Sequence, residues 1–187
     1  MAVPPQDLTE RLQRWGSGDK AVLNDIVSVA YDELRTIAGA YLKRETRTHT
    51  LQATALVNEL YIRLARIRDA RFSDRKHFYA FTAHLMRIML IDSARRSKAA
   101  RRNGGERNIP LHEELAWIDA TSEDAIALDQ ALDQLEREDE RKVRVIELRY
   151  FLGCTNEETA ELLGISRPTV DRELEFSKAW LYRRLRS

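Results

Sequence analysis

The sequence predicts an all-α protein: two helical domains joined by an acidic linker, the C-terminal domain containing a helix-turn-helix. Three observations point to this class. The 187 residues include only 7 Gly and 4 Pro, which is few for a protein rich in the turns of β-sheets. Apolar residues recur at helical spacing through much of the chain. Charges are segregated into a basic, an acidic and a second basic stretch.

The segregation of charge also indicates the domain boundaries. Residues 71–107 hold ten bases against three acids, residues 108–140 one Arg against eleven acids, and residues 141–187 ten bases against seven acids. Asn103, Gly104 and Gly105 should stop a helix, and the following segment lacks sustained periodicity. We expect a first domain over residues 1–103, a linker over 104–121 and a second domain over 122–187. Apolar linker residues such as Trp117 either pack on a domain or bind a partner, and the sequence leaves both open.

In the first domain, the apolar spacing predicts three helices, over residues 21–41, 51–66 and 77–101. The third begins with aromatic and apolar residues and ends in the basic run RRSKAARR. Basic residues that could bind phosphates, next to aromatic residues that could stack on bases, suit the binding of an opened DNA strand. Phe78, Phe81 and Ile88, however, are better interpreted as core residues. In the second domain, the spacing predicts one helix after Ser122 and another through Val143 and Phe151.

The stretch from Thr155 to Leu181 has the pattern of a helix-turn-helix. Gly164 supplies the turn, Ala160 lets two helices cross closely, and Ser166 can cap the second helix. Pro168 falls in the first turn of that helix, where its missing N–H costs nothing. A plain helical hairpin with solvated charges is the alternative interpretation of the same pattern.

In such motifs the N-terminal residues of the second helix enter the major groove. Arg side chains there can pair with guanine or with phosphate, and a Glu can accept from cytosine or orient an Arg. The residues expected to contact duplex DNA are Ser166, Arg167, Pro168, Thr169, Arg172, Glu173 and Lys178.

A second set of candidates lies in the first domain. The basic third helix could hold a DNA backbone, and the loop before it could close around an extruded base. The residues expected to contact an opened strand are Phe72, Arg87, Arg95, Arg96, Lys98 and Arg101.

Two segments resemble sigma factors of the extracytoplasmic-function (ECF) group of the sigma-70 family. The stretch ALVNELYIRL, from Ala55, is similar to the second-domain helix of that family, and the helix through Ile91, Asp92, Arg95 and Arg96 is similar to its next block. The resemblance covers nearly the whole chain. Asp171 and Glu173 stand where the family has basic residues, which puts the ordinary contacts to the upstream promoter element in doubt.

The resemblance implies core RNA polymerase and promoter DNA as partners, with an anti-sigma factor as a further candidate. The helix-turn-helix would bind duplex DNA near minus thirty-five and the first domain the non-template strand near minus ten. The residues that the resemblance assigns to polymerase binding are Leu56, Val57, Asn58, Glu59, Tyr61 and Arg63. It implies no cofactor, no metal and no catalytic residue.

The sequence also bears on other classes of protein: enzymes, membrane or secreted proteins, and other DNA-binding factors. The four His and single Cys form no metal-ligand spacing, and the chain has no phosphate-binding Gly loop or nucleophile elbow, so we expect no enzyme. No apolar run approaches a membrane span, and the N-terminal segment lacks the apolar core of a signal peptide, so we expect a cytoplasmic protein. A stand-alone helix-turn-helix regulator and a sigma factor unable to open promoters remain alternatives.

Overall fold

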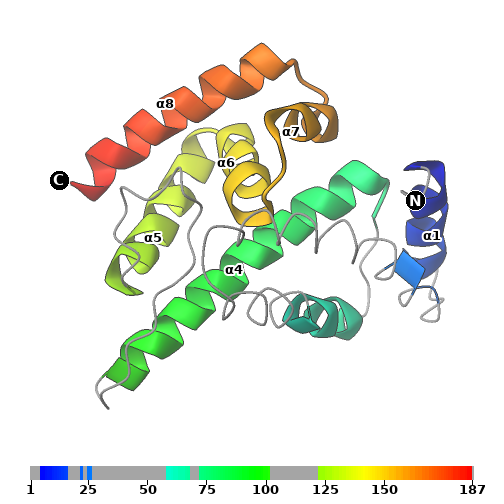
Figure 1. The fold of residues 1–187 in the computed structure, drawn as a ribbon, viewed down its shortest axis with the longest axis horizontal. Coiled ribbons are helices and arrows are strands. Elements are labelled where there is room, and N and C mark those ends of the chain that lie inside the picture. The colour runs from blue at the N-terminus through cyan, green and yellow to red at the C-terminus, as the bar shows by residue number, and fades with distance from the viewer. Residues whose placement is uncertain are drawn as a thin grey trace, which may run out of the picture. The chain divides into compact units, whose positions relative to one another are not determined.

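In the computed structural model, the described part of the chain consists of helices and the short segments that join them, with no strand among these residues (Figure 1). The structure describes residues 5–16, 22, 25–26, 58–67, 72–101 and 122–186. Within these ranges the all-α prediction is confirmed. The expected linker and most of the first expected helix lie outside the described residues. Two compact units are formed, one of residues 1–82 and one of residues 83–187.

The first unit contains a helix that the apolar spacing did not predict, α1 (Pro5–Gly16). Its buried residues Leu12 and Trp15 lie on one face, because three residues make close to one helical turn. Arg11 of α1 forms a 3.5 Å ion pair with Asp25. Residues 58–66 are helical as expected, with Leu60 and Leu64 buried four positions apart.

Helix α4 (Arg75–Arg101) is the expected third helix, and it begins two residues earlier than predicted. The division between the two units falls inside α4, between Thr82 and Ala83, and not after residue 103. The later part of α4 joins the second unit because its side chains pack and pair with later helices, as Ile91 does with Ala125. The expected domain boundary at residue 103 stays a prediction.

Three further segments follow in the second unit: α5 (Ser122–Glu138), α6 (Glu140–Ile146) and a π-helix, η2 (Glu147–Leu152). Helix α5 buries one face, formed by Ala125, Leu128, Ala131, Leu132 and Leu135, which recur at the helical period. Asp139 lies between α5 and α6, and its side chain caps the start of α6. The expected helix through Val143 and Phe151 is therefore present, but it widens into a π-helix.

The chain ends in α7 (Asn156–Leu163) and α8 (Arg167–Leu185), joined by a short turn. Helix α8 packs against α5, α6 and α7 (Figure 1). Its buried face includes Val170, Leu174 and Leu181, spaced four and seven residues apart. This packing fixes which side of α8 faces away from the core.

Candidate DNA-binding surfaces

Helix α7 is capped at both of its ends, and its second end forms the turn into α8. At the start of α7, the Glu158 backbone N–H donates to the Thr155 hydroxyl at 3.2 Å, and the Thr155 N–H donates to the Glu158 carboxylate at 2.7 Å. This reciprocal capping box satisfies two N–H groups that the helix leaves without partners. Gly164 ends α7 with φ 65°, a conformation that costs glycine little. The expected role of Gly164 is confirmed.

Ser166 caps the second helix of the pair, as its residue type predicts. Its hydroxyl accepts from the Thr169 N–H at 3.3 Å and lies 2.8 Å from the Thr169 hydroxyl. Pro168 lies in the first turn of α8. Val170 is fully buried, while Ser166, Arg167 and Pro168 are exposed. The start of α8 thus forms an exposed surface next to a buried side chain.

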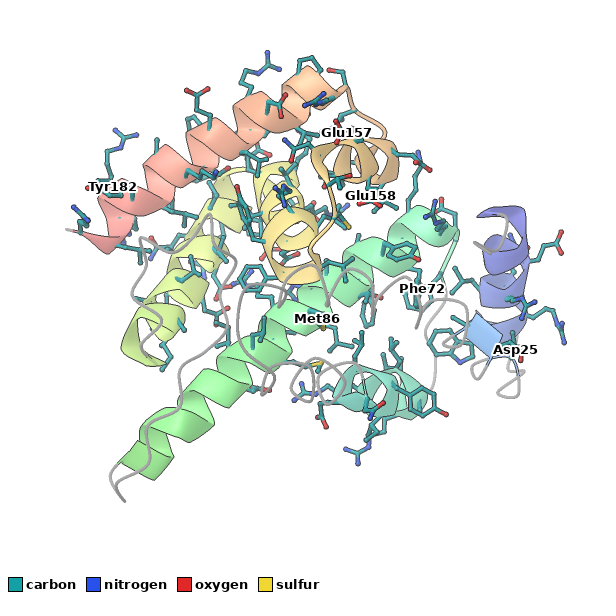
Figure 2. All side chains as sticks on the ribbon, in the orientation of Figure 1. Asp25, Phe72, Met86, Glu157, Glu158 and Tyr182 are labelled. Atoms are coloured by element: carbon teal, nitrogen blue, oxygen red, sulfur yellow. The ribbon has the colours of Figure 1, made fainter. Side chains whose placement is uncertain are left out.

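Polar and charged side chains near this surface form a chain of contacts. Arg149 Nε donates to the Asn156 side-chain oxygen at 2.8 Å, and Asn156 Nδ2 donates to Asp171 Oδ1 at 2.6 Å. Arg167 Nε lies 3.0 Å from Glu157 of α7 and 4.0 Å from Asp171 (Figure 2). These contacts hold the side chains of the first turns of α8 in defined positions.

Arg172 differs from Arg167, its neighbour one and a half turns away. It is exposed, and within residues 122–186 it forms no ion pair with a described side chain. A guanidinium in this state can bind an anion or a base edge without first breaking a contact.

Glu173 and Lys178, two candidates for contact with duplex DNA, are placed differently from the others. Glu173 is buried, with its carboxylate 2.9 Å from Arg141 and 3.1 Å from Lys142. Lys178 is half-buried, with Nζ 5.4 Å from the centre of the Tyr150 ring. In this structure both side chains join α8 to earlier parts of the chain. Sequence reasoning missed Arg141 and Lys142 because they lie some thirty residues before Glu173.

Phe72, the candidate for holding an extruded base, is also buried. Its ring centre lies 5.4 Å from that of Trp15, 5.4 Å from Phe78 and 5.3 Å from Phe81 (Figure 2). Aromatic rings at this separation attract one another and bury a large apolar area. The cluster confirms that Phe78 belongs to the core, whereas the same expectation for Ile88 is wrong because its side chain is exposed.

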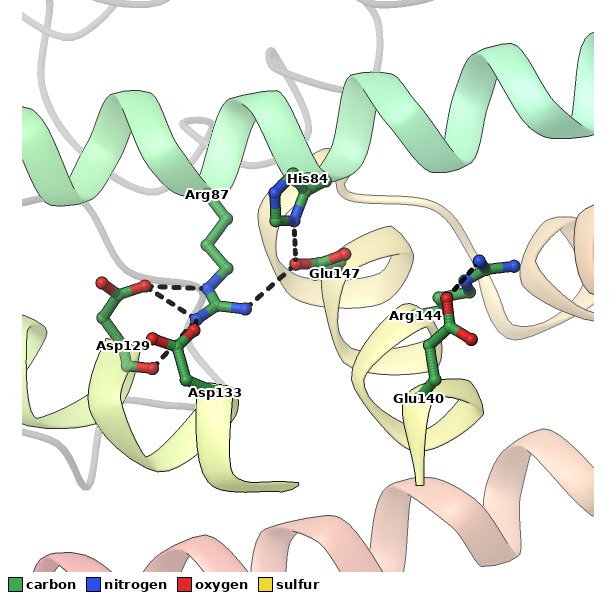
Figure 3. A network of polar contacts seen from close by, with 7 residues as sticks. All are labelled: His84, Arg87, Asp129, Asp133, Glu140, Arg144 and Glu147. Atoms are coloured by element: carbon green, nitrogen blue, oxygen red, sulfur yellow. Dashed lines mark hydrogen bonds and ion pairs between the residues drawn. The ribbon is translucent and has the colours of Figure 1, made fainter. Parts of the chain in front are cut away.

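Arg87, another candidate strand contact, is buried, with only 2% of its surface exposed. Its guanidinium is bonded to the carboxylates of Asp129, Asp133 and Glu147 (Figure 3). Burial alone would lower the pKa of Arg87, but Asp129 and Glu147 outweigh it and raise that pKa above its usual value. The guanidinium is therefore charged.

Four basic candidates follow Arg87 along α4: Arg95, Arg96, Lys98 and Arg101. The structure gives their backbone as helical, and their side chains lie outside what it describes. On the helical stretch over residues 58–66, Asn58 is exposed, and Glu59, Tyr61 and Arg63 are half-buried. Arg63 Nε donates to Glu59 Oε1 at 3.1 Å. Leu56 and Val57 lie outside the described residues.

The described ranges contain no group of His, Cys, Asp and Glu side chains that could hold a metal ion. None of the helices described is both long and apolar enough to cross a membrane.

Comparison with known families places these surfaces in context. A family model for ECF sigma factors matches residues 5–187 of the chain. The chain belongs to the ECF sigma factor family. No curated protein matches it. As an ECF sigma factor, the chain has a role in transcription initiation, and its family comprises DNA-binding regulators of transcription and not enzymes.

Proposed function

We propose that this chain binds core RNA polymerase and directs it to promoter DNA, with α7 and α8 acting as a helix-turn-helix on the duplex near minus thirty-five. The observation that carries this proposal is the start of α8, where Arg167 and Arg172 are exposed in the first two turns of the helix that follows Gly164. The capped end of a helix presents its first side chains to the major groove. Arg172 reads a base edge or a phosphate, because no described carboxylate occupies it.

Within this surface the side chains divide into base contacts and supports. Ser166 and Thr169 fix the start of the helix through their mutual hydrogen bond and can donate to a phosphate. Asp171, held by Asn156, is repelled by phosphates and suits the amino group of cytosine. We assign Glu173 a structural role because its carboxylate is buried against Arg141 and Lys142.

The other contacts that a sigma factor needs are assigned to the earlier helices. The half-buried and exposed side chains of residues 58–63 bind the polymerase, and the basic end of α4 holds the non-template strand near minus ten. Charge along this helix makes such binding sensitive to salt, since each phosphate contact releases counterions. An anti-sigma protein that covers either surface would inhibit the factor.

Run-off transcription tests the proposal. A bacterial core polymerase is supplied with a pool of promoter fragments, with and without the full chain, and the transcripts are sequenced. Specific transcripts that need the chain are expected. Binding to a palindromic site without any requirement for polymerase would contradict the proposal and favour a stand-alone regulator.

A variant with a matched control sharpens this test. Asp171→Asn should change the base preferred at one position of the upstream element among the selected promoters. Glu161→Gln removes the same charge from an exposed position of α7 and should leave the preference unchanged. If both variants select the same promoters as the unmodified chain, Asp171 does not read DNA.

A further inference from the structure

Arg87 has a guanidinium whose three nitrogen atoms are all occupied within the chain. Nε donates to Asp129 Oδ1 at 2.9 Å, and Nη1 donates to Glu147 Oε1 at 3.2 Å. Nη2 donates to the backbone carbonyl of Asp129 at 2.9 Å and to the carboxylate of Asp133. These bonds use four of the five N–H groups, and the remaining N–H on Nη1 is out of reach of a phosphate because Arg87 is only 2% exposed.

The carboxylates around Arg87 come from two separate segments. Asp129 and Asp133 lie one turn apart on α5, and Glu147 begins η2 (Figure 3). We call these three residues the acidic cradle. Its three negative charges exceed the single charge of Arg87. His84, one turn before Arg87 on α4, lies with Nδ1 2.9 Å from Glu147 Oε1 and adds a second basic group.

We propose that the acidic cradle is an autoinhibitory contact, which holds Arg87 of α4 in the free protein and must release it before this part of α4 can bind the opened promoter strand. The inference rests on the proposed function, because it takes the basic side of α4 to be a DNA-binding surface. Carboxylates and phosphates compete for the same planar fork of N–H donors. The guanidinium of Arg87 can therefore bind the cradle or DNA, but not both at once.

Exposure indicates where the contact can open. The side chains of Glu147 and Arg87 are 4% and 2% exposed, whereas that of Asp133 is 55% exposed and that of Asp129 16%. Water and competing anions therefore reach the α5 side of the cradle first. Release of α5 would uncover Arg87 while Glu147 still balances its charge, so the guanidinium is not left buried and unpaired.

Binding to single-stranded DNA by the full chain without polymerase tests the inference. The variant Asp129→Asn with Asp133→Asn removes two cradle charges and leaves Glu147 in place. The control, Glu138→Gln with Glu161→Gln, removes two exposed charges that lie outside the cradle. Fluorescence anisotropy with a labelled mixed-sequence strand should show about tenfold tighter binding for the cradle variant than for the control, a coupling of ordinary size.

A third variant separates release of Arg87 from a general gain in positive charge. Adding Arg87→Gln to the cradle variant should abolish its gain over the control. If the cradle variant and the control bind equally, or the gain persists without Arg87, the inference is overturned and the cradle is structural. Circular dichroism establishes that each variant folds.

Hydrogen exchange of the unmodified chain gives an independent measure that needs no substitution. Addition of the single strand should speed amide exchange in α5, because its contact with α4 opens; unchanged exchange would contradict the inference. The run-off assay distinguishes this failure from failure of the proposed function. Promoter-specific transcripts from the unmodified chain, together with equal binding by both variants, would overturn the autoinhibitory contact alone.

Discussion

Two arginines expected to contact DNA are in opposite states in the second unit. Arg87 of α4 is 2% exposed and bonded to three carboxylates, whereas Arg172 of α8 is exposed. The residue type is the same, and the difference comes from the elements packed around each. Arg87 faces the carboxylates of α5 and η2, whereas Arg172 lies on the exposed face of α8. A basic residue in a sequence therefore identifies a possible DNA contact, but only its neighbours determine whether it is available.

The largest effect is expected from removing the enclosed arginine. Arg87→Ala leaves the carboxylates of the cradle without their cation and should lower the free energy of unfolding by about 3 kcal/mol, the usual scale for breaking a buried ion pair. Urea denaturation followed by circular dichroism measures this. Arg144→Ala is the matched control, because Arg144 and its partner Glu140 are half exposed (Figure 3). Arg144→Ala should lower the free energy of unfolding by about 0.5 kcal/mol. Equal losses for the two variants would show that the buried ion pairs of Arg87 stabilise the fold no more than an exposed pair does.

The exposed arginine should show the reverse pattern. Arg172→Ala should weaken binding of the holoenzyme to promoter DNA by about 2 kcal/mol if it reads a base, with little change in the free energy of unfolding. Competition binding measures the affinity, and thermal melting measures the stability. Arg137→Ala, on an exposed position of α5, controls for the loss of one charge. If both variants weaken binding equally, Arg172 contributes only general electrostatic attraction and does not read a base.

Parts of this comparison could be predicted from the sequence, and parts could not. The turn at Gly164, the cap at Ser166 and the buried Val170 follow from local residue types, and the structure confirms them. The surroundings of Arg87 do not, because its partners lie 42, 46 and 60 residues further along the chain. Acidic residues in α5 resemble a solvated face when only their spacing is considered.

Two other features were missed for related reasons. Helix α1 has 12 residues, most of them polar, so few apolar positions mark it in the sequence, although Leu12 and Trp15 are buried. The hydrogen-bond register of the π-helix η2 depends on how the neighbouring segments pack against it, and the sequence pattern does not specify that packing. Glu173 occupies a helix position typical of DNA contacts, but its pairing with Arg141 and Lys142 is a tertiary contact.

A smaller effect is expected from the support of the exposed surface. Thr155→Ala removes the side chain of the capping box at the start of α7 and should lower the free energy of unfolding by about 1 kcal/mol. Thr155→Ser keeps the hydroxyl and should recover most of that loss. Urea denaturation of the two variants measures both values. If Ala and Ser behave alike, the hydroxyl does not stabilise the start of α7.

The smallest effect concerns pH and the enclosed arginine. The hydrogen bond to Glu147 raises the pKa of His84, with burial and Arg87 opposing and Glu136 assisting. Because the pKa of His84 is higher in the folded state, protonation of His84 stabilises the fold. This contribution is complete below the unfolded-state pKa of 6.5 and is lost as the pH rises through the folded-state pKa. The stability difference between the unmodified chain and His84→Gln should therefore shrink as the pH rises above 6.5. A difference independent of pH would show that His84 is not protonated in the fold.

Photo-crosslinking in the transcription complex tests the central claim most directly. A photoreactive residue replaces Arg172 in one variant and Glu161 of α7 in a control, and each is assembled with core polymerase on a selected promoter. The account predicts that the label at position 172 attaches to the upstream duplex near minus thirty-five and that the label at position 161 does not. Absence of attachment to DNA from position 172, in a complex that still transcribes, would contradict the assignment of α8 to promoter recognition.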